Sequence, residues 1–550
     1  MNDRYFINYR DFRTAEGAFS KLFCDYVNDF EKVGQYYSGN FHSRENIFGK
    51  IPEIKNRYQH RSLVAEVLKE QNKAFGSSER SMENIKYFEE ETTFAVVTGQ
   101  QVGILGGPLY TVYKTITAIK LAQELTTQFP QFKFIPIFWL EGEDHDFNEI
   151  NVIKLLNAEN THVQVEYLIH GKPLERNIGA AGEIIFDDYL IKFLKETEEI
   201  LANSEFKKPL FDSIRSFYRP GISFNTAFAL IMNKLFGDSG IVFISANDKR
   251  LKHILAPVFQ REIQEYPHIS QIIIERSAEL EVSYHAQIKT KALNLFLFHK
   301  GGRFHIEPRE EGFSLKGVRQ HLTKEELLHI AAETPELLSP NVALRPICQD
   351  TILPTVAYVG GPAEIAYFAQ LQPVYKHFGL TMPIIYPRAT ATIGEAKVGR
   401  ILEKYEVDII DFFDSYDHVS KHVIETISEV DIEELFNNSA TRIKDLINEM
   451  RFGLNYIDPT LQSPLDTTHE KMAAHLAALK AKVMAAQQIK HETALRQLQK
   501  VTHLIYPNGN FQERELNIIY FMNKYGLAFV KWLTDELDYD SFEHQLLWLT

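Results

Sequence analysis

Five short apolar runs, each followed by a turn and then by a helical pattern, limit the fold of this chain more than any other feature. The runs cover residues 92–97, 132–140, 240–246, 353–359 and 382–386. Strands that are buried on both faces have continuous apolar sequences, and alternation of strand and helix is typical of parallel sheets. The sequence therefore predicts an α/β fold built on a Rossmann-like doubly wound parallel sheet.

The order of the strands predicts where a ligand would bind. In the usual order for this fold the first and fourth strands are central neighbours, and ligands bind in the crevice between their carboxyl ends. Glycine-rich turns follow both of these strands, at residues 98–108 and 360–362. The connections at about 151–238 and 260–350 are too long for simple crossovers, so we expect two inserted subdomains in a core of residues 1–394.

Residues 395–505 change to long helical patterns. Apolar side chains recur at three- and four-residue spacing, which predicts a coiled-coil arm, kinked or broken near Pro459 and Pro464. We expect the arm to form a homodimer, although an arm that only folds back on itself would show the same pattern. We expect residues 506–550 to pack back on the core. The apolar positions of the arm are Ile443, Leu446, Met450, Leu454, Ile457, Leu461, Met472, Leu476, Leu479, Val483 and Ala486.

The charge and cysteine content exclude several classes of function. Lys and Arg number 59 against 73 Asp and Glu, a net charge of −14, and such an acidic surface repels nucleic acids. The first ten residues carry charges and no apolar signal segment, and no stretch approaches the roughly 18 apolar residues of a membrane span. Cys24 and Cys348 stand far apart, so we expect neither a disulfide framework nor a cysteine-rich zinc site. We expect a soluble cytoplasmic protein that binds neither nucleic acid nor membrane.

The first glycine loop follows a buried strand and precedes a helix. Backbone N–H groups at a helix start attract phosphate or carboxylate groups, and glycines allow such a ligand to approach the main chain closely. The loop matches neither a Walker motif nor a G-x-G-x-x-G motif, and it could be only a tight turn. Lys114, on the helix, could face an anion or lie in solvent. The residues expected to bind substrate or nucleotide here are Thr98, Gly99, Gln100, Gln101, Tyr110 and Lys114.

The turn after the second strand, residues 141–148, has the sequence EGEDHDFN. Carboxylates bind hard cations such as Mg²⁺, and a carboxylate beside a histidine can accept a proton from a substrate. We therefore expect Glu141, Asp144, His145 and Asp146 to be catalytic and Asn148 to be a binding residue. The same letters would also suit a helix N-cap formed by Asp144 or Asp146.

Polar residues also gather before and after the fourth strand. Arg345, in the segment SPNVALRPICQD, has a planar guanidinium group that can bind two carboxylate oxygens, although an Arg345–Asp350 pair could equally anchor the inserted subdomain. The expected binding residues before the strand are Asn341, Arg345, Gln349 and Asp350. Those after the fourth and fifth strands are Gly360, Gly361, Glu364, Tyr367 and Arg388.

Four segments resemble the cysteine ligase family of bacillithiol biosynthesis, whose reaction is the addition of cysteine to glucosaminyl-malate. They read VVTGQQVGILGGPLYTVYKTI, IFWLEGEDHDFNEIN, SPNVALRPICQDTILPTVAYVGGPAEIAYFAQL and YPNGNFQERELNIIYFMNKYG. The resemblance implies a Rossmann core with two connecting insertions and a coiled-coil arm used for homodimerisation. It also implies activation of the cysteine carboxylate, then amide formation with the glucosamine amine. From the resemblance we infer only that the residues named above belong to the motifs of this family.

The resemblance leaves the activation step open. Class I tRNA synthetases, whose core this family is like, contact ATP through an H-x-G-H pattern and a K-M-S-K loop. Here TGQQ stands after the first strand and Tyr386-Pro387-Arg388 after the last. ATP and Mg²⁺ are therefore candidate cofactors only. Two other functions fit the same residues, a nucleotidyltransferase-like enzyme acting on another small substrate and a non-catalytic dimeric scaffold that binds a metabolite. The acid-rich turn near two glycine loops favours an enzyme.

Overall fold

The computed structural model of the chain describes residues 5–12, 19–174, 177–289, 293–428 and 430–549. Its contacts divide the chain into two compact units, and each is described by itself. The first unit comprises Met1–Asp11, Glu16–Ile393 and Asn510–Leu547, and the second comprises Phe12–Ala15, Gly394–Gly509 and Trp548–Thr550. None of the helices in the described ranges combines the length and the hydropathy that a membrane span requires.

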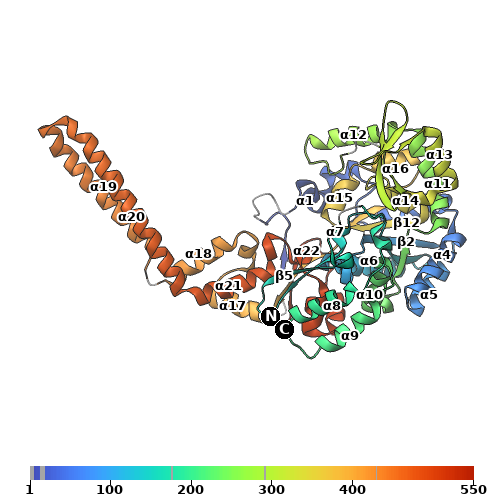
Figure 1. The fold of residues 1–550 in the computed structure, drawn as a ribbon, viewed down its shortest axis with the longest axis horizontal. Coiled ribbons are helices and arrows are strands. Elements are labelled where there is room, and N and C mark those ends of the chain that lie inside the picture. The colour runs from blue at the N-terminus through green and yellow to red at the C-terminus, as the bar shows by residue number, and fades with distance from the viewer. Residues whose placement is uncertain (1–4, 13–18, 175–176, 290–292, 429, 550) are drawn as a thin grey trace. The chain divides into compact units, whose positions relative to one another are not determined.

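A five-stranded parallel sheet forms the centre of the first unit (Figure 1). The strand order is β13-β12-β2-β3-β6, and the neighbours pair in parallel throughout. All five predicted strands are present, and the first and fourth of them, β2 and β12, are adjacent as expected. The α/β prediction is therefore confirmed. The strands are β2 (Thr93–Gln101), β3 (Lys133–Glu141), β6 (Val242–Ser245), β12 (Thr355–Gly360) and β13 (Ile384–Pro387).

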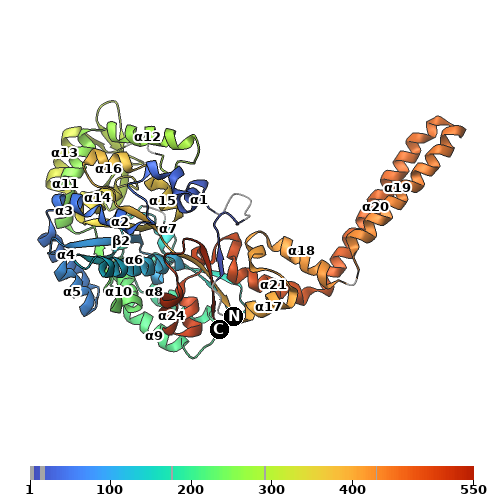
Figure 2. The same ribbon diagram turned by 180° about the vertical axis from the view of Figure 1, so that it is seen from behind.

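Helices bury the apolar strands of this sheet. Helix α6 (Leu109–Gln128) packs against β2, β3 and β12, and Figure 2 shows it lying along the sheet beside β2. Helix α4 (Arg61–Ala74) packs against β6 and α11 (Lys249–Gln264). Because both faces are covered, the central strands carry few polar side chains along most of their length, and polar groups concentrate at their carboxyl ends.

Glycines shape the loop between β2 and α6. A Cβ atom at Gly99 would lie only 3.0 Å from the Trp139 carbonyl oxygen, so glycine permits the close spacing of β2 and β3 there. Gly106 and Gly107 have φ angles of 89° and 71°, a backbone region that residues with a side chain rarely adopt. The loop therefore turns sharply and brings the start of α6 back beside the end of β2.

Two long connections leave this sheet. Between β3 and β6 the chain forms the hairpin of β4 (Val152–Leu156) and β5 (His162–Glu166), followed by three helices. Between α11 and β12 it forms helices α12 and α13 and an antiparallel sheet with strand order β10-β9-β8-β7-β11. The helices are α8 (Tyr189–Ile200), α9 (Lys207–Phe217), α10 (Phe224–Phe236), α12 (His268–Glu281), α13 (Lys324–Glu333) and α14 (Arg345–Ile352). The antiparallel strands are β7 (Leu295–His299), β8 (Gly302–Pro308), β9 (Phe313–Leu315), β10 (His321–Leu322) and β11 (Leu338–Pro340).

The end of the chain returns to the first unit. Strand β15 (His544–Leu549) pairs with β1 (Tyr5–Ile7) in a sheet whose third strand is β14 (Thr390–Glu395). The Asn517 amide donates hydrogen bonds to the carbonyls of Leu105 and Gly107, at 3.1 and 2.7 Å. This segment therefore supports the glycine loop directly. Its helices are α22 (Gln512–Glu515), α23 (Ile518–Tyr525) and α24 (Ala528–Glu536).

The second unit is helical. Its two longest helices, α19 (Ile432–Ile457) and α20 (Gln462–Lys490), lie side by side in both Figure 1 and Figure 2. The reversal falls at Asp458-Pro459, close to the predicted break, while Pro464 lies in the first turn of α20 and does not interrupt it. Lys480 of α20 forms an ion pair with Glu433 of α19 at 2.6 Å. The other helices are α17 (Ala396–Tyr405), α18 (Tyr416–Ile427) and α21 (Glu492–Ile505).

Candidate functional site

A cavity of about 280 Å³ opens at the carboxyl ends of β2, β3 and β12. The three turns that the sequence singled out all contribute to it, because the ends of adjacent parallel strands meet at one edge of the sheet. Eleven of the residues expected from the sequence lie in its wall. They are Gly99, Gln100, Gln101, Tyr110, Lys114, Glu141, Arg345, Gly361, Glu364, Tyr367 and Arg388.

A buried ion pair between Lys114 and Glu364 forms one wall of the cavity. The ammonium group of Lys114 also donates to the Gly99 carbonyl at 2.9 Å and to Gln100 Oε1 at 3.1 Å. Burial lowers the pKa of Lys114, and the charge of Glu364 opposes that shift in part. For Glu364, burial favours the neutral form, but Lys114 and the Gly361 N–H outweigh it and lower the pKa. Lys114 therefore holds the two glycine turns together from inside the cavity.

Glu364 is fixed by two further hydrogen bonds. It accepts the Tyr358 hydroxyl at 2.6 Å and the Gly361 N–H at 2.8 Å, the second of which caps helix α15 (Pro362–Phe368). A carboxylate with these partners has little capacity left for a ligand. We therefore assign Glu364 to the framework of the cavity.

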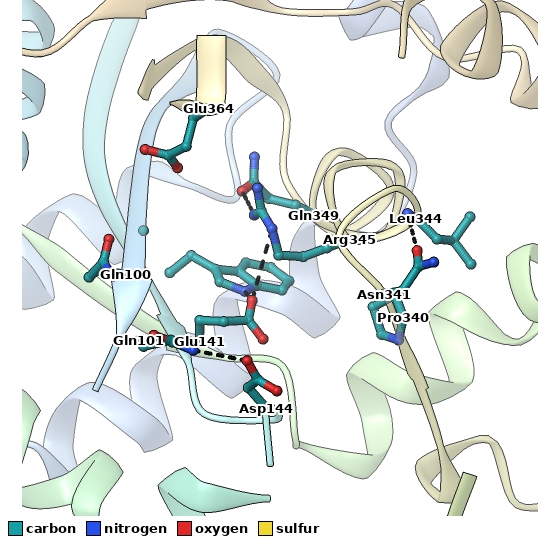
Figure 3. Close-up of polar contacts among 12 residues, drawn as sticks. Gln100, Gln101, Glu141, Asp144, Pro340, Asn341, Leu344, Arg345, Gln349 and Glu364 are labelled. Atoms are coloured by element: carbon teal, nitrogen blue, oxygen red, sulfur yellow. Dashed lines mark hydrogen bonds and ion pairs between the residues drawn. The ribbon is translucent and has the colours of Figure 1, made fainter. Parts of the chain in front are cut away.

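Arg345 reaches into the cavity toward Glu141, as Figure 3 shows. Its Nε lies 4.0 Å from Glu141 Oε2, and its other nitrogens donate to Gln349 Oε1 at 3.1 Å and to the Tyr367 hydroxyl at 2.9 Å. The alternative Arg345–Asp350 pair does not form, because the Asp350 carboxylate accepts hydrogen bonds from Tyr375 and Gln349 instead. Arg345 is therefore directed at the cavity and not at the subdomain boundary.

Glu141 is the cavity carboxylate with a raised pKa. Burial is the main cause, and the nearby charge of Arg345 opposes it in part. The Trp139 indole donates a hydrogen bond to Glu141 Oε2 at 3.1 Å. A carboxylate whose pKa is raised toward neutrality is better suited to accept a proton from a substrate than one with an ordinary pKa.

The Nε–H group of Arg388 is buried and has no hydrogen-bond acceptor among the described residues. Its side chain is 3% exposed and pairs with Glu513 at 2.6 Å, but within the described residues its Nε has no hydrogen-bond acceptor. A Cβ atom at Gly361 would come within 3.2 Å of that Nε, so the glycine keeps the guanidinium edge open. A buried N–H without an acceptor is costly, and an anionic ligand would satisfy it.

The acidic turn divides between the cavity wall and the surface. Asp144 accepts the Gln101 amide at 2.9 Å, while His145 and Asp146 are exposed and do not line the cavity. Asp146 occupies the N-cap position of α7 (Phe147–Ile150) but its side chain makes no capping hydrogen bond, and the Asp144 carboxylate accepts the His145 N–H instead. Neither side chain therefore caps the helix in the way the sequence suggested as an alternative. Asn148 lines a neighbouring cavity.

The remaining expected residues support the site from outside the cavity. The Thr98 hydroxyl donates to the Val359 carbonyl at 3.0 Å and so links β2 to β12. Asn341 accepts the N–H groups of Ala343 and Leu344 before α14. Gln349, Asp350 and Gly360 do not line the cavity. Gln349 accepts a hydrogen bond from Arg345 and so orients it, and the Asp350 carboxylate accepts one from the Tyr375 hydroxyl. Gly360 is the last residue of β12.

Arg303, on β8, was not expected from the sequence. Its guanidinium group lies 3.2 Å from Asp144 Oδ1, donates to Ser339 and to the Pro340 carbonyl at 2.8 Å, and lies over the Phe296 ring. A second anchor is the buried ion pair of Lys252 with Glu143. The antiparallel sheet and α11 therefore hold the acidic turn from behind.

Three cavity residues also escaped the sequence prediction. Trp139 and Tyr358 lie in strands that read as continuous apolar core, and Arg514 lies in the C-terminal segment, far from any glycine turn. A polar tip on an aromatic residue near a strand end is a weak signal that could have indicated the first two. Among the described residues, no group of three or more His, Cys, Asp or Glu side chains is placed to hold a metal ion.

Two family models together match nearly the whole chain. Residues 7–389 match the Bacillithiol biosynthesis BshC, N-terminal Rossmann-like domain, and residues 391–549 match the Bacillithiol biosynthesis BshC, C-terminal coiled-coil domain. This chain belongs to the BshC family. The expected resemblance is thereby confirmed, and all of the residues that line the cavity except Arg514 lie in the Rossmann-like part of a BshC protein.

Relatives that carry the name cysteine ligase BshC are similar over almost their full length. The protein of Salinibacter ruber is 36% identical, with 97% of each chain covered. The proteins of Chloroherpeton thalassium and Chlorobaculum tepidum are 35% and 34% identical, with 99% of each chain covered in both cases. This BshC chain is therefore similar to these relatives over nearly the whole length of both chains.

Proposed function

We propose that this chain is a ligase that joins the carboxyl group of L-cysteine to the amine of glucosaminyl-malate in the last step of bacillithiol biosynthesis. The observation that carries the proposal is the cavity at the carboxyl ends of β2, β3 and β12, where Glu141 has a raised pKa near the guanidinium group of Arg345 and where Arg388 also lies in the wall. Amide formation needs an anion site for the carboxyl group and a proton acceptor for the amine. The names of the relatives, cysteine ligase BshC, agree with this chemistry.

In this proposal Glu141 accepts the proton of the attacking amine. The amine of an amino sugar is largely protonated near neutral pH and must lose a proton before it can attack a carbonyl carbon. Glu141 lies in the cavity, whereas His145 and Asp146 are exposed outside it. General-base catalysis of this kind contributes typically about 10²–10⁴-fold in rate. Asp144 would act indirectly, by orienting Gln101.

Arg388 and the Gly360-Gly361 turn would hold the anionic group that is activated. The free Nε of Arg388 and the open space at Gly361 suit a carboxylate or phosphate oxygen equally. ATP would supply the phosphoryl or adenylyl group that activates the cysteine carboxylate, so that phosphate or AMP would leave when the amine attacks the acyl carbon. Arg345 and Lys114 would keep the surrounding potential positive while this anion is bound. Mg²⁺ stays a prediction that rests on the carboxylates of residues 141–148.

The test is the thiol product itself. Purified protein is incubated with cysteine, glucosaminyl-malate and ATP, and the mixture is examined by mass spectrometry for the cysteinyl amide. We expect the product with the unaltered chain, no product when ATP is omitted, and at least 100-fold less with Glu141→Gln. A folded protein that forms no amide under any of these conditions would refute the ligase proposal.

We also propose that the α19–α20 hairpin mediates a homodimer. Large apolar side chains on it are exposed, among them Phe452 at 77%, Tyr456 at 87% and Ile489 at 76% of their surface. When a second copy covers exposed apolar side chains of this kind, their burial lowers the free energy of the pair. We further propose that the protein works in the cytoplasm, because Cys24 and Cys348 are both free and buried thiols, as a reducing compartment favours.

A further inference from the structure

A second cavity adjoins the first. Its volume is about 450 Å³, within the range of about 300–1,000 Å³ that small-molecule sites occupy. It lies between the glycine loop after β2, the α7 turn, the β4–β5 hairpin and α22. The two cavities share Gln100, Gln101, Tyr110 and Arg514 in their walls, so ligands bound in both would meet at these four residues.

Arg514 is a cation that forms no ion pair with the described residues around this junction. Lys154, the other cation of the second cavity, forms an ion pair with Glu515 at 2.9 Å. The guanidinium group of Arg514 has neither an ion pair nor a hydrogen bond to any described residue, although it lies in both cavity walls. An exposed guanidinium group at a cavity junction is suited to bind a carboxylate in a bidentate manner.

The remaining wall of the second cavity is rich in carboxamides. Asn148 and Gln164 both face it, and neither amide is hydrogen bonded within the described part of the chain. A carboxamide offers two donors and an acceptor, which matches hydroxyl groups that must both donate and accept. The cavity therefore combines neutral polar groups for a polyhydroxylated ring with the free cation of Arg514 for an acid group, and it also holds the carboxylate of Glu149, which interacts with Gln101.

We propose that the second cavity binds the amine substrate, with its sugar ring against Asn148 and Gln164 and its carboxylates on Arg514. The inference rests on the proposed function, and it divides the two substrates between the cavities. The cysteine carboxyl group then lies in the first cavity with Arg388 and Glu141. The amine reaches it across the shared wall at Gln100 and Gln101.

The test compares Arg514→Gln and Gln164→Leu in the full chain. We expect each variant to raise the KM and the calorimetric Kd for glucosaminyl-malate at least tenfold. Gln164, unlike Arg514, lines the second cavity alone, so Gln164→Leu should leave the KM for cysteine within twofold of normal. With a methyl glucosaminide, which lacks the malate carboxylates, Gln164→Leu should still weaken binding while Arg514→Gln should not. Gln123→Leu on the exposed side of α6 and Arg496→Gln in α21 are matched controls and should change neither substrate.

The binding measurement separates this inference from the ligase reaction, because it needs no turnover. If the unaltered chain forms the amide but both variants keep normal affinity for glucosaminyl-malate, the second cavity is not its site. An effect of Arg514→Gln on ATP affinity alone would overturn the assignment in favour of a nucleotide site. If no amide forms but the affinity for glucosaminyl-malate depends on both residues, the subsite stands and the ligase proposal fails.

Discussion

The ion pair of Lys252 with Glu143 offers a sharp test of how the acidic turn is held. Both side chains are almost fully buried, at 1% and 5% exposure, and Lys252 also donates to the Leu338 carbonyl at 2.8 Å. Replacing Lys252 with Met would leave the Glu143 charge buried without a partner, which costs about 3–5 kcal/mol. Replacing both, as Lys252→Met with Glu143→Leu, removes the uncompensated charge and should recover at least about 2 kcal/mol of that loss.

The assay is urea unfolding followed by circular dichroism and tryptophan fluorescence. Lys249 provides the matched control, since it lies on the same helix and pairs with Glu336 at 3.1 Å, but is 76% exposed. Lys249→Met should cost less than about 1 kcal/mol because exposed pairs contribute little. Equal destabilisation by Lys252→Met and Lys249→Met would refute the reasoning, as would a double variant less stable than Lys252→Met alone.

Three other predictions concern the catalytic carboxylate, a buried histidine of β15 and the apolar face of the hairpin. Because burial raises the pKa of Glu141, kcat/KM should rise with pH through an acidic limb above the usual carboxylate range, and Glu141→Gln should abolish that limb in a pH–rate profile. Burial lowers the pKa of His544 to about 4, so its contribution to stability is complete above about pH 6.5 and is lost as pH falls toward 4. Unfolding measurements should then show about 2 kcal/mol lost by pH 5, and His544→Asn should lack this component. The double variant Leu476→Lys, Leu479→Lys should be monomeric in sedimentation analysis. If the unaltered chain and this variant have the same mass, the hairpin pairs only with itself.

The central sheet could be predicted because its signal is local. Each strand is an apolar run that ends at a glycine or acidic turn, and strand polarity alone brings such turns to one edge. Gln101, Glu141 and Gly361 were found in this way, since each lies in such a turn. The helical repeat of residues 443–461 and 472–486 was equally legible, because a 3.6-residue period depends only on neighbours in sequence.

Other parts of the site depend on long-range contacts that a single sequence does not encode. Arg303 reaches Asp144 across 159 positions, and no local pattern on β8 distinguishes it from a surface arginine. Arg514 lies in both cavity walls only because the C-terminal segment returns to the sheet. The acidic turn shows the converse, since residues adjacent in sequence do not all face the cavity: Glu141 lines it, while His145 and Asp146 are exposed.

The return of residues 510–547 to the first unit constrains how the protein can be made and divided. Glu513 lies 125 positions after Arg388, so 125 further residues are added before the partner of Arg388 has been synthesised. At about 5–20 residues per second, a ribosome needs roughly 6–25 s to cover that stretch, during which the nascent sheet holds a buried guanidinium group without its carboxylate. Both long helices of the second unit are made in this interval. A chain truncated at the end of the Rossmann-like domain would therefore lack Glu513, the partner of Arg388, and Arg514 of the cavity wall. A functional minimal enzyme would need a short linker that joins residue 393 directly to residue 510.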